Sequence, residues 1–178
     1  MFMTLMNPVR RSGSAITFRT PCAEDGPAVT ALIAACPPLD PNSAYCNLLQ
    51  CTHFADTCII AERDDEVAGW ISGYQLPADP SRYFLWQVAV SASARGEGLA
   101  GRMLDALLMR PAMESVTHLI TTVTDDNEAS WGLFRSFAER RSASLRKSLC
   151  FDRDAHFAGQ HASEWQAEIG PFSAAIQS

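Results

Sequence analysis

Residues 83–110 most limit how this chain can fold, because they read as a strand, a tight turn and a helix. The run 83–90 is apolar except for Gln87 and rich in aromatic and β-branched residues, which predicts a strand buried on both faces. Over residues 97–109 apolar side chains recur at helical spacing, and Pro111 ends that pattern. This apolar stripe consists of Leu99, Met103, Leu104, Leu107 and Leu108.

The turn between strand and helix is rich in glycine. It reads Arg95, Gly96, Glu97, Gly98, Leu99 and Ala100. Glycine lets a backbone approach a ligand closely, and the start of the next helix offers free N–H groups at the positive end of its dipole. The turn therefore predicts an anion site, most naturally a phosphate site.

Three interpretations of this turn are open. The string Gly96-x-Gly98-x-x-Gly101 fits the dinucleotide-binding fingerprint, which would make the chain a nicotinamide-binding module. In that fold, however, the first glycine follows its strand directly, whereas residues 91–95 intervene here. The string Arg95-x-x-Gly98-x-Ala100 resembles the Arg/Gln-x-x-Gly-x-Gly/Ala motif of the Gcn5-related N-acetyltransferases, whose loop holds the pyrophosphate of acetyl-CoA. The third interpretation is a glycine-rich turn that binds nothing.

The composition is that of an ordinary globular domain, with 178 residues, 47% hydrophobic and 19% charged. The net charge of −6 argues against a nucleic-acid partner. No segment is apolar for long enough to span a membrane or direct export, so we expect no membrane partner and a cytoplasmic location. The six cysteines include no Cys-x-x-Cys, and no histidine pair has zinc spacing, so no metal is assigned.

The hydrophobic pattern predicts one domain over residues 15–170, between a flexible tail at 1–14 and a C-terminal tail at 171–178. Strands are expected at 15–19, 57–62, 67–75, 83–90, 118–124 and 143–151, and helices at 24–36, 44–54, 97–109, 127–139 and, as a short one, 163–169. Residues 77–81 are expected to form a loop. The hairpin over 57–75 predicts antiparallel pairing, and the later alternation of strands and helices predicts parallel pairing. The fold class is α/β with a mixed sheet.

Four segments carry a more specific resemblance, at 37–54, 86–90, 95–104 and 121–134. They read PPLDPNSAYCNLLQCTHF, WQVAV, RGEGLAGRML and TTVTDDNEASWGLF. Together they resemble the L-2,4-diaminobutyrate acetyltransferases of ectoine biosynthesis, over roughly residues 16–170. The resemblance implies a sheet that splays apart at the acetyl-CoA site, and a homodimer. It also implies acetyl transfer from acetyl-CoA to the 4-amino group of diaminobutyrate, giving N4-acetyl-L-2,4-diaminobutyrate.

The resemblance implies five substrate-binding residues, namely Asp40, Tyr45, Trp86, His161 and Glu164. Carboxylates and a phenol suit a substrate with two ammonium groups and one carboxylate, and an indole ring can face a cation. Without the resemblance, Asp40 reads as a turn carboxylate, Tyr45 as a half-buried helix residue and Trp86 as a core residue that shares a strand face with Phe84, Val88 and Val90. His161 and Glu164 read as surface residues on one side of a helical turn.

The co-substrate residues follow from the same resemblance. The loop 95–100 would hold the pyrophosphate, and the backbone of Val88 and Val90 would serve the oxyanion and the pantetheine arm. Asn127 and Ser130, at the start of a helix, would lie near that arm, although simple capping explains Asn127 equally well.

The catalytic groups are less well defined by the sequence. The amine must lose a proton, and Glu164 acting through water is the candidate base. Many members carry a tyrosine as general acid where this chain has Phe134, so Tyr45 or water is the candidate acid. An acetyltransferase for another small amine and an acetyl-CoA-binding sensor without catalysis are the alternative functions.

Overall fold

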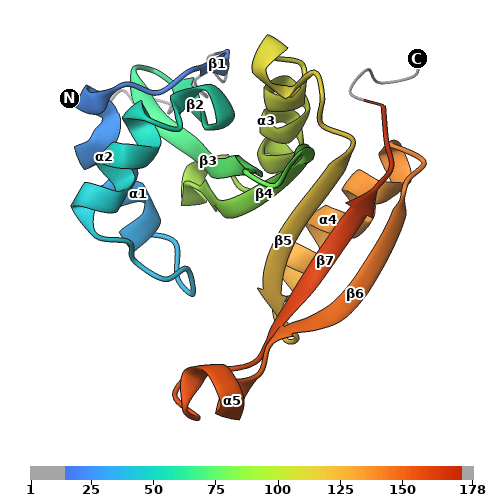
Figure 1. The fold of residues 1–178 in the computed structure, drawn as a ribbon. Helices are drawn as coiled ribbons and strands as arrows, with labels where there is room; N and C mark the ends of the chain where they lie inside the picture. Colours follow the sequence, from blue (N-terminus) through green and yellow to red (C-terminus); the bar gives the residue numbers. More distant parts are fainter. Residues whose placement is uncertain (1–14, 174–178) are drawn as a thin grey trace, which may run out of the picture.

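A computed structural model of the protein describes residues 15–173, and it folds them around one seven-stranded sheet (Figure 1). The strands lie in the order β1-β2-β3-β4-β5-β7-β6. Their bounds are β1 Thr17–Arg19, β2 Ile59–Arg63, β3 Glu66–Leu76, β4 Asp79–Val90, β5 His118–Thr124, β6 Ser144–Phe151 and β7 Glu164–Gly170. Pairing is antiparallel throughout except between β4 and β5, which run parallel. The mixed α/β sheet expected from the sequence is confirmed.

Helices cover both faces of this sheet (Figure 1). The α-helices are α1 Gly26–Ala34, α2 Ala44–Thr52, α3 Leu99–Leu108, α4 Glu128–Arg140 and α5 Arg153–Phe157; the 3-10 helices are η1 Ala23–Asp25, η2 Ala55–Thr57, η3 Ala92–Ala94 and η4 Pro111–Met113. Helix α1 packs on β3 and β4 from one side, while α3 and α4 pack from the other. Helix α5 projects from the end of the β6–β7 hairpin (Figure 1).

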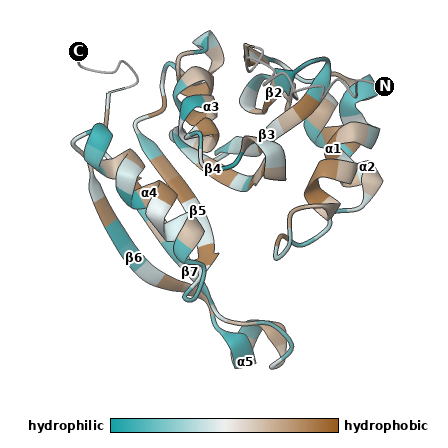
Figure 2. Cartoon of the chain, turned by 180° about the vertical axis from the view of Figure 1, so that it is seen from behind, coloured by the Kyte–Doolittle hydropathy of each residue, from teal (hydrophilic) through white to brown (hydrophobic). Residues whose placement is uncertain are grey.

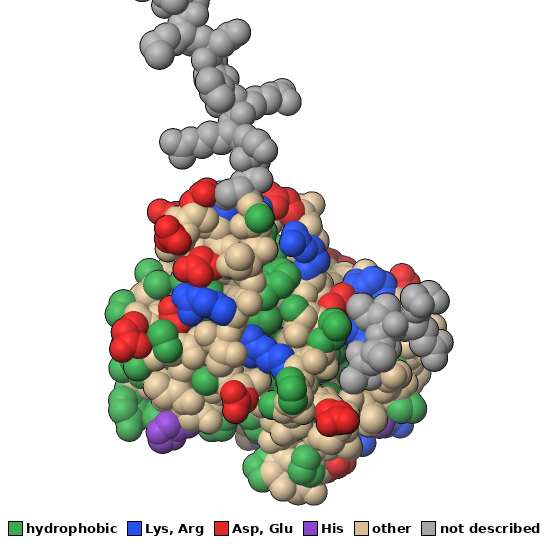
Figure 3. All heavy atoms as spheres, turned by 90° about the horizontal axis from the view of Figure 1, so that it is seen from above, with side chains coloured by type: hydrophobic (Ala, Val, Ile, Leu, Met, Phe, Trp, Pro, Cys, Tyr) green, Lys and Arg blue, Asp and Glu red, His purple; other side chains and the backbone are tan. Residues whose placement is uncertain are grey.

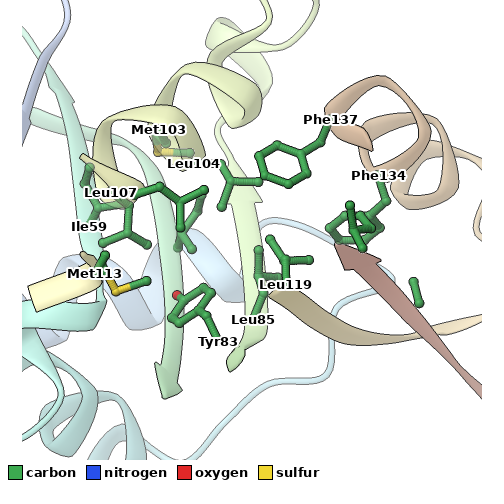
Figure 4. Close-up of a cluster of buried hydrophobic side chains, with 14 of the residues drawn as sticks. Ile59, Tyr83, Leu85, Met103, Leu104, Leu107, Met113, Leu119, Phe134 and Phe137 are labelled. Atoms are coloured by element: carbon green, nitrogen blue, oxygen red, sulfur yellow. The ribbon is translucent and has the colours of Figure 1, made fainter. Parts of the chain in front are cut away.

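The core lies mainly between the sheet and the helices α3 and α4. The whole predicted stripe of α3, from Leu99 to Leu108, is buried there. Figure 4 shows three of its side chains facing Tyr83 and Leu85 of β4, with two phenylalanines of α4 beside them. A smaller cluster under α1 contains Val29, Ile33 and Trp70. The amphipathic helix after the central strand thus anchors the fold, as the sequence predicts.

Strands β4 and β5 pair only at their beginning. Three residue pairs join them, from Arg82 with His118 to Phe84 with Ile120. Strand β4 then continues to Val90 and β5 to Thr124 without further pairing to each other. The sheet therefore opens into two arms beyond Phe84, with α1 and α2 beside one arm and α4 behind the other (Figure 1).

A β-bulge in β4 lies where the two strands separate. Gln87 pairs with Ser72 and Leu85 pairs with Gly73, so Trp86 is the extra residue in β4. A bulge reverses the alternation of side chains after it. Before the bulge, Tyr83 and Leu85 face the core under α3 and α4. After the bulge, Val88 and Val90 pack against the same core, although in an unbroken strand they would point to the opposite face.

Two expectations for this strand are therefore wrong. Trp86 does not share a face with Val88 and Val90, because the bulge changes the phase between them. The strand is also not buried on both faces along its length, since the Trp86 side chain is 46% exposed. In addition, residues 79–81 belong to β4 instead of a loop, so the β3–β4 connection is shorter than expected.

The C-terminal part departs most from the sequence expectation. Residues 164–170 form the strand β7 instead of a helix, and the short helix of this region is α5. Strand β7 inserts between β5 and β6, antiparallel to both, so the expected parallel pairing of the last strand with β5 is wrong. Phe172, in the segment predicted as a tail, is buried against Phe137 of α4. The predicted tail at 1–14 lies outside the described residues.

On the face seen from above, basic and acidic side chains are interspersed (Figure 3). The hydropathy view from behind shows a largely apolar β5, and a β6 with hydrophilic stretches at the edge of the sheet (Figure 2), as expected for an inner and an edge strand. Within residues 15–173, no helix is long and apolar enough to cross a membrane.

Candidate active site

A cleft with a volume of about 820 Å³ opens between the two arms of the sheet. Its floor is the β4 segment from Phe84 to Val88 and the β5 segment from Thr121 to Thr124. The start of α4 forms one wall, and the loop that precedes α2 forms another. The cleft brings together seven of the predicted site residues, which are Asp40, Trp86, Val88, Asn127, Ser130, His161 and Glu164.

Three titratable side chains gather at one end of this cleft. The Nε2 atom of His161 lies 3.7 Å from Oδ2 of Asp40, and its Nδ1 atom lies 4.0 Å from Oε1 of Glu164. His161 is held by a 2.8 Å contact between Nδ1 and the carbonyl oxygen of Ala162 and by a tilted ring contact with Phe157 of α5, with 4.8 Å between the ring centroids. His161 lies in a loop and Glu164 begins β7, so the expectation that both share a helical turn is wrong, although the two side chains do meet.

The two carboxylates differ in their surroundings. The side chain of Glu164 is 18% exposed and that of Asp40 is 83% exposed. Burial raises the pKa of Glu164, and Asp40 adds to this, while His161 and a hydrogen bond from Thr122 oppose it. Glu164 is thus a desolvated carboxyl group in a cleft, the kind of environment in which a group binds a cation or exchanges a proton.

Trp86 stands in the cleft because of the bulge. Its ring meets Tyr74 of β3 edge-on at 6.4 Å between centroids, and Tyr74 also contacts Phe84 at 5.4 Å. These aromatic rings give the cleft an apolar side close to the acidic cluster. Such a surface suits an aliphatic stem that carries an ammonium group.

The start of α4 follows the sequence prediction. The side chain of Asn127 caps the helix by accepting a 3.1 Å hydrogen bond from the backbone N–H of Ser130. Both residues also line the cleft. Capping and a place in the cleft are therefore compatible for Asn127.

The glycine-rich turn lies beyond the cleft, where β4 leads through η3 into α3. Gly96 and Gly98 have φ angles of 79° and 67°, a left-handed conformation that favours glycine. A Cβ atom at either position would meet nothing within 4 Å, so both glycines face open space. Gly98 is the N-cap of α3 and has no side chain to satisfy the free N–H groups.

Neighbouring side chains hold this turn in place. Arg95 donates from Nε to the carbonyl oxygen of Val90 at 3.1 Å, and Glu97 forms an ion pair with Arg63 of β2. Arg63 lowers the pKa of Glu97. The Leu99 side chain is buried in the core, whereas Ala100 is only partly buried. Open N–H groups above a fixed turn suit a pyrophosphate.

Two other residues singled out by sequence lie as follows. Tyr45 is 71% exposed on α2 and is not among the residues that line the cleft, so the structure does not bring its phenol to the acidic cluster. Phe134 is buried at the cleft wall formed by α4, where its ring has no proton to donate. Among residues 15–173, no three or more His, Cys, Asp or Glu side chains are arranged so that they could hold a metal ion.

Sequence reasoning gave no role to several residues of the cleft. Thr121, Thr122 and Thr124 of β5 line its floor, and Asn42 and Gln87 meet at the loop before α2. The β-branched run 118–124 predicted the strand, but only the separation of β4 and β5 makes this strand edge part of a cleft. The N-cap of α2 is Ser43, whose side chain accepts a hydrogen bond from the backbone N–H of Cys46.

Comparison with known proteins decides among the interpretations of this site. The acetyltransferase (GNAT) family profile matches residues 27–138. The L-2,4-diaminobutyric acid acetyltransferase of Methylotuvimicrobium alcaliphilum is 46% identical over 169 residues, which covers 95% of this chain and 98% of that protein. The enzyme of the same name from Chromohalobacter salexigens is 49% identical over 155 residues, covering 86% of this chain and 80% of that protein. The chain belongs to the diaminobutyrate acetyltransferase family of GNAT enzymes.

A solved structure of this acetyltransferase family agrees with the fold. The diaminobutyrate acetyltransferase from Paenibacillus lautus, in complex with its substrate L-2,4-diaminobutyric acid and coenzyme A, superposes with a TM-score of 0.86 at 37% identity. The match covers 93% of this chain and all of that chain. The assignment of the chain to the GNAT family is thus confirmed, and the role of the glycine-rich turn in holding the pyrophosphate stays a prediction.

Proposed function

We propose that this acetyltransferase moves the acetyl group of acetyl-CoA to the 4-amino group of L-2,4-diaminobutyrate, giving N4-acetyl-L-2,4-diaminobutyrate for ectoine biosynthesis. The observation that carries the proposal is the acidic cluster of Asp40, His161 and Glu164 at one end of a cleft that runs along the opened sheet. A diamino acid of this length needs negative charge for its ammonium groups and a free path to a thioester.

Substrate binding would use the two carboxylates and the aromatic side of the cleft. Glu164 and Asp40 would accept charge-assisted hydrogen bonds from the α-ammonium group, and the ring of Trp86 would pack along the methylene stem. Tyr45 stays a predicted substrate and catalytic residue. Its exposed position on α2 would require a change of conformation before its phenol reached this end of the cleft.

Acetyl-CoA would lie across the gap between β4 and β5. Its pyrophosphate would meet the N–H groups of residues 95–100, where the left-handed glycines leave the backbone open. The pantetheine arm would follow β4 past Val90 and Val88 toward the start of α4 at Asn127 and Ser130. The thioester would then stand between these residues and the acidic cluster.

The reaction would be a direct transfer. The 4-amine, after losing a proton, attacks the carbonyl carbon of the thioester, and the C=O electrons form an oxyanion that a backbone N–H group of β4 stabilises. Collapse of this intermediate breaks the C–S bond and releases coenzyme A as a thiolate. Glu164, desolvated but open to the cleft, is the base we propose, acting through water. Phe134 cannot protonate the thiolate, so water or Tyr45 supplies that proton.

The assembly and location of the enzyme extend this proposal. A homodimer and a cytoplasmic location are expected from the family and the composition. Sedimentation at micromolar protein concentration tests the assembly, and a monomer mass would reject the dimer.

A panel of small amines with acetyl-CoA tests the function. The protein is incubated with diaminobutyrate, its homologues 2,3-diaminopropionate and ornithine, and monoamines, and the release of free thiol is followed. We expect the highest kcat/KM with diaminobutyrate. A higher value with another amine would identify a different acetyltransferase, and tight acetyl-CoA binding without thiol release would identify a sensor.

A further inference from the structure

A buried chain of amides joins the wall of the cleft to its floor. Gln87 of β4, only 7% exposed, donates from Nε2 to the carbonyl oxygen of Asp40 at 2.7 Å. Its Oε1 atom accepts from Nδ2 of Asn42, also at 2.7 Å. One side chain thus binds two residues of the loop 39–42, one through a donor and one through an acceptor.

The chain continues into the helices α1 and α2. Asn42 also donates to Oδ1 of Asn47 at 3.1 Å, and the fully buried Asn47 donates from Nδ2 to the hydroxyl group of Thr30 at 2.8 Å. Thr30 in turn donates to the carbonyl oxygen of Gly26 at 2.8 Å. Each buried amide in this series has a hydrogen-bond partner, so the network fixes its side chains in one arrangement.

The loop 39–42 needs such support from side chains. It contains no helix or strand. The loop makes one backbone–backbone hydrogen bond, which the N–H of Leu39 donates to the carbonyl oxygen of Cys36. The Asp40 carboxylate is 83% exposed, and its position opposite His161 depends on where the backbone of residue 40 lies. Gln87 fixes that backbone to β4 directly after the bulge at Trp86.

We propose that Gln87 is a positioning residue that sets the distance between the ammonium-binding end of the cleft and the thioester. This inference rests on the proposed function of the cleft. The strand that carries Gln87 also carries Val88 and Val90, beside which acetyl-CoA would lie. A fixed distance from Asp40 to this strand selects a diamino acid by its length, because one methylene too many or too few displaces the reacting amine.

The variant Gln87→Met tests this role, because methionine has a similar size and lacks both hydrogen-bonding groups. We expect the KM for diaminobutyrate to rise about tenfold, as loss of two hydrogen bonds predicts. The preference for diaminobutyrate over ornithine, measured as a ratio of kcat/KM, should fall by a similar factor. The dissociation constant of acetyl-CoA should stay within about twofold of the wild type.

Two further variants separate positioning from general damage. Thr30→Val removes the far end of the network outside the cleft, and we expect the same selectivity change at about threefold. Gln75→Met is the matched control, since Gln75 makes its two hydrogen bonds to Ala112 and Ser115, away from the cleft. It should leave KM and selectivity at wild-type values.

Hydrogen exchange of the backbone amides in residues 39–43 provides a readout that needs no amine substrate. Faster exchange in Gln87→Met than in Gln75→Met supports the proposal that Gln87 fixes the loop 39–42. Unchanged exchange together with unchanged selectivity would overturn the proposal, as would an equal loss of acetyl-CoA affinity and diaminobutyrate turnover. If the wild type fails to acetylate diaminobutyrate while exchange is still faster in Gln87→Met, the proposed substrate is wrong, but the role of Gln87 in fixing the loop is retained.

Discussion

The imidazole of His161 lies 3.7 Å from the carboxylate of Asp40, which brings the loop before α2 to the segment that leads into β7. Both residues line the cleft, and the contact joins segments that lie far apart in the chain. Strands β4 and β5 separate beyond Phe84, and in the proposed function the co-substrate lies in that gap. Under that proposal, substrate recognition and co-substrate binding would use separate parts of the cleft.

Removal of either acidic group should weaken diaminobutyrate turnover. Charge-assisted hydrogen bonds contribute about 1.5–3 kcal/mol each, so Asp40→Asn and Glu164→Gln should lower kcat/KM roughly ten- to a hundredfold. The effect should be larger for Glu164, which is less exposed. Acetyl-CoA binding should stay near wild type, and Asp65→Asn, in the β2–β3 turn, serves as control. Normal turnover by both variants would place the substrate elsewhere.

A negative charge in the glycine-rich turn should abolish binding of acetyl-CoA. Gly98 has a φ of 67° and open space around a Cβ atom, so Gly98→Asp should fold and place its carboxylate near the pyrophosphate. We expect the affinity measured by calorimetry to fall on the order of a hundredfold or more. Gly98→Asn has the same shape without the charge and tolerates this φ, so it should lose far less. Equal affinities for wild type and Gly98→Asp would refute the phosphate site.

An ion pair near the N-terminus should make stability depend on pH. Asp25 accepts two 2.8 Å hydrogen bonds from Arg19, which lowers the pKa of its carboxyl group to about 2. A lowered pKa stabilises the fold above the ordinary value of 3.8, and this contribution is lost as pH falls through about 2. Allowing for the partial exposure of Arg19, Asp25→Asn should lower the free energy of unfolding at pH 7 by about 1–2 kcal/mol.

Urea unfolding of wild type and Asp25→Asn at pH 7, 4 and 2.5 measures this difference. The gap between the two proteins should narrow toward the lowest pH. Asp64→Asn, in the exposed turn before β3, should show no such pattern. A gap that stays constant down to pH 2.5 would show that the carboxylate charge does not stabilise the fold.

Replacement of the glycine opposite the bulge, Gly73, should destabilise the fold. A Cβ at Gly73 would lie 2.3 Å from the hydroxyl of Tyr83 and 2.4 Å from the carbonyl oxygen of Phe84. Tyr83 is fully buried and donates to the carbonyl oxygen of Thr57, so its ring has little freedom to move. Gly73→Ala should cost about 1–3 kcal/mol or more. Gly132→Ala, in α4 with open space around it, should be neutral or stabilising by up to about 1 kcal/mol. Thermal unfolding of both variants and the wild type measures these differences.

The parts of the fold with local signals were predictable. The stripe from Leu99 to Leu108 predicted α3 and its buried face, and the glycines before it predicted a tight turn, whose left-handed φ angles the structure adds. Strand β5 has the predicted bounds, because the β-branched run 118–124 is unambiguous. Asn127 was recognised as a cap from its place before an apolar helical pattern.

Strand β7 was missed although its sequence carries a signal. Trp165, Ala167 and Ile169 alternate with polar residues, and the last two of them are fully buried. The short polar context favoured a helix, and pairing with both β5 and β6 overrides that preference. The bulge at Trp86 has no glycine or proline to indicate it, so its change of phase could not be read from the strand alone.

The candidate site was predictable only through resemblance to a family. No periodicity places Asp40 next to His161, because this contact depends on the insertion of β7 between β5 and β6. The network of Gln87 and Asn42 likewise joins segments whose proximity is set by the whole sheet. Sequence patterns identify elements, and the site arises from their packing.

The regiochemistry of the product tests the central claim most directly. The enzyme is incubated with acetyl-CoA and L-2,4-diaminobutyrate, and NMR of the product determines which nitrogen carries the acetyl group. If the acidic cluster holds the α-amino end and presents the other amine to the thioester, the product is the N4-acetyl compound alone. Acetylation of the α-amino group, or a mixture of both products, would contradict the orientation that Asp40, His161 and Glu164 are proposed to impose.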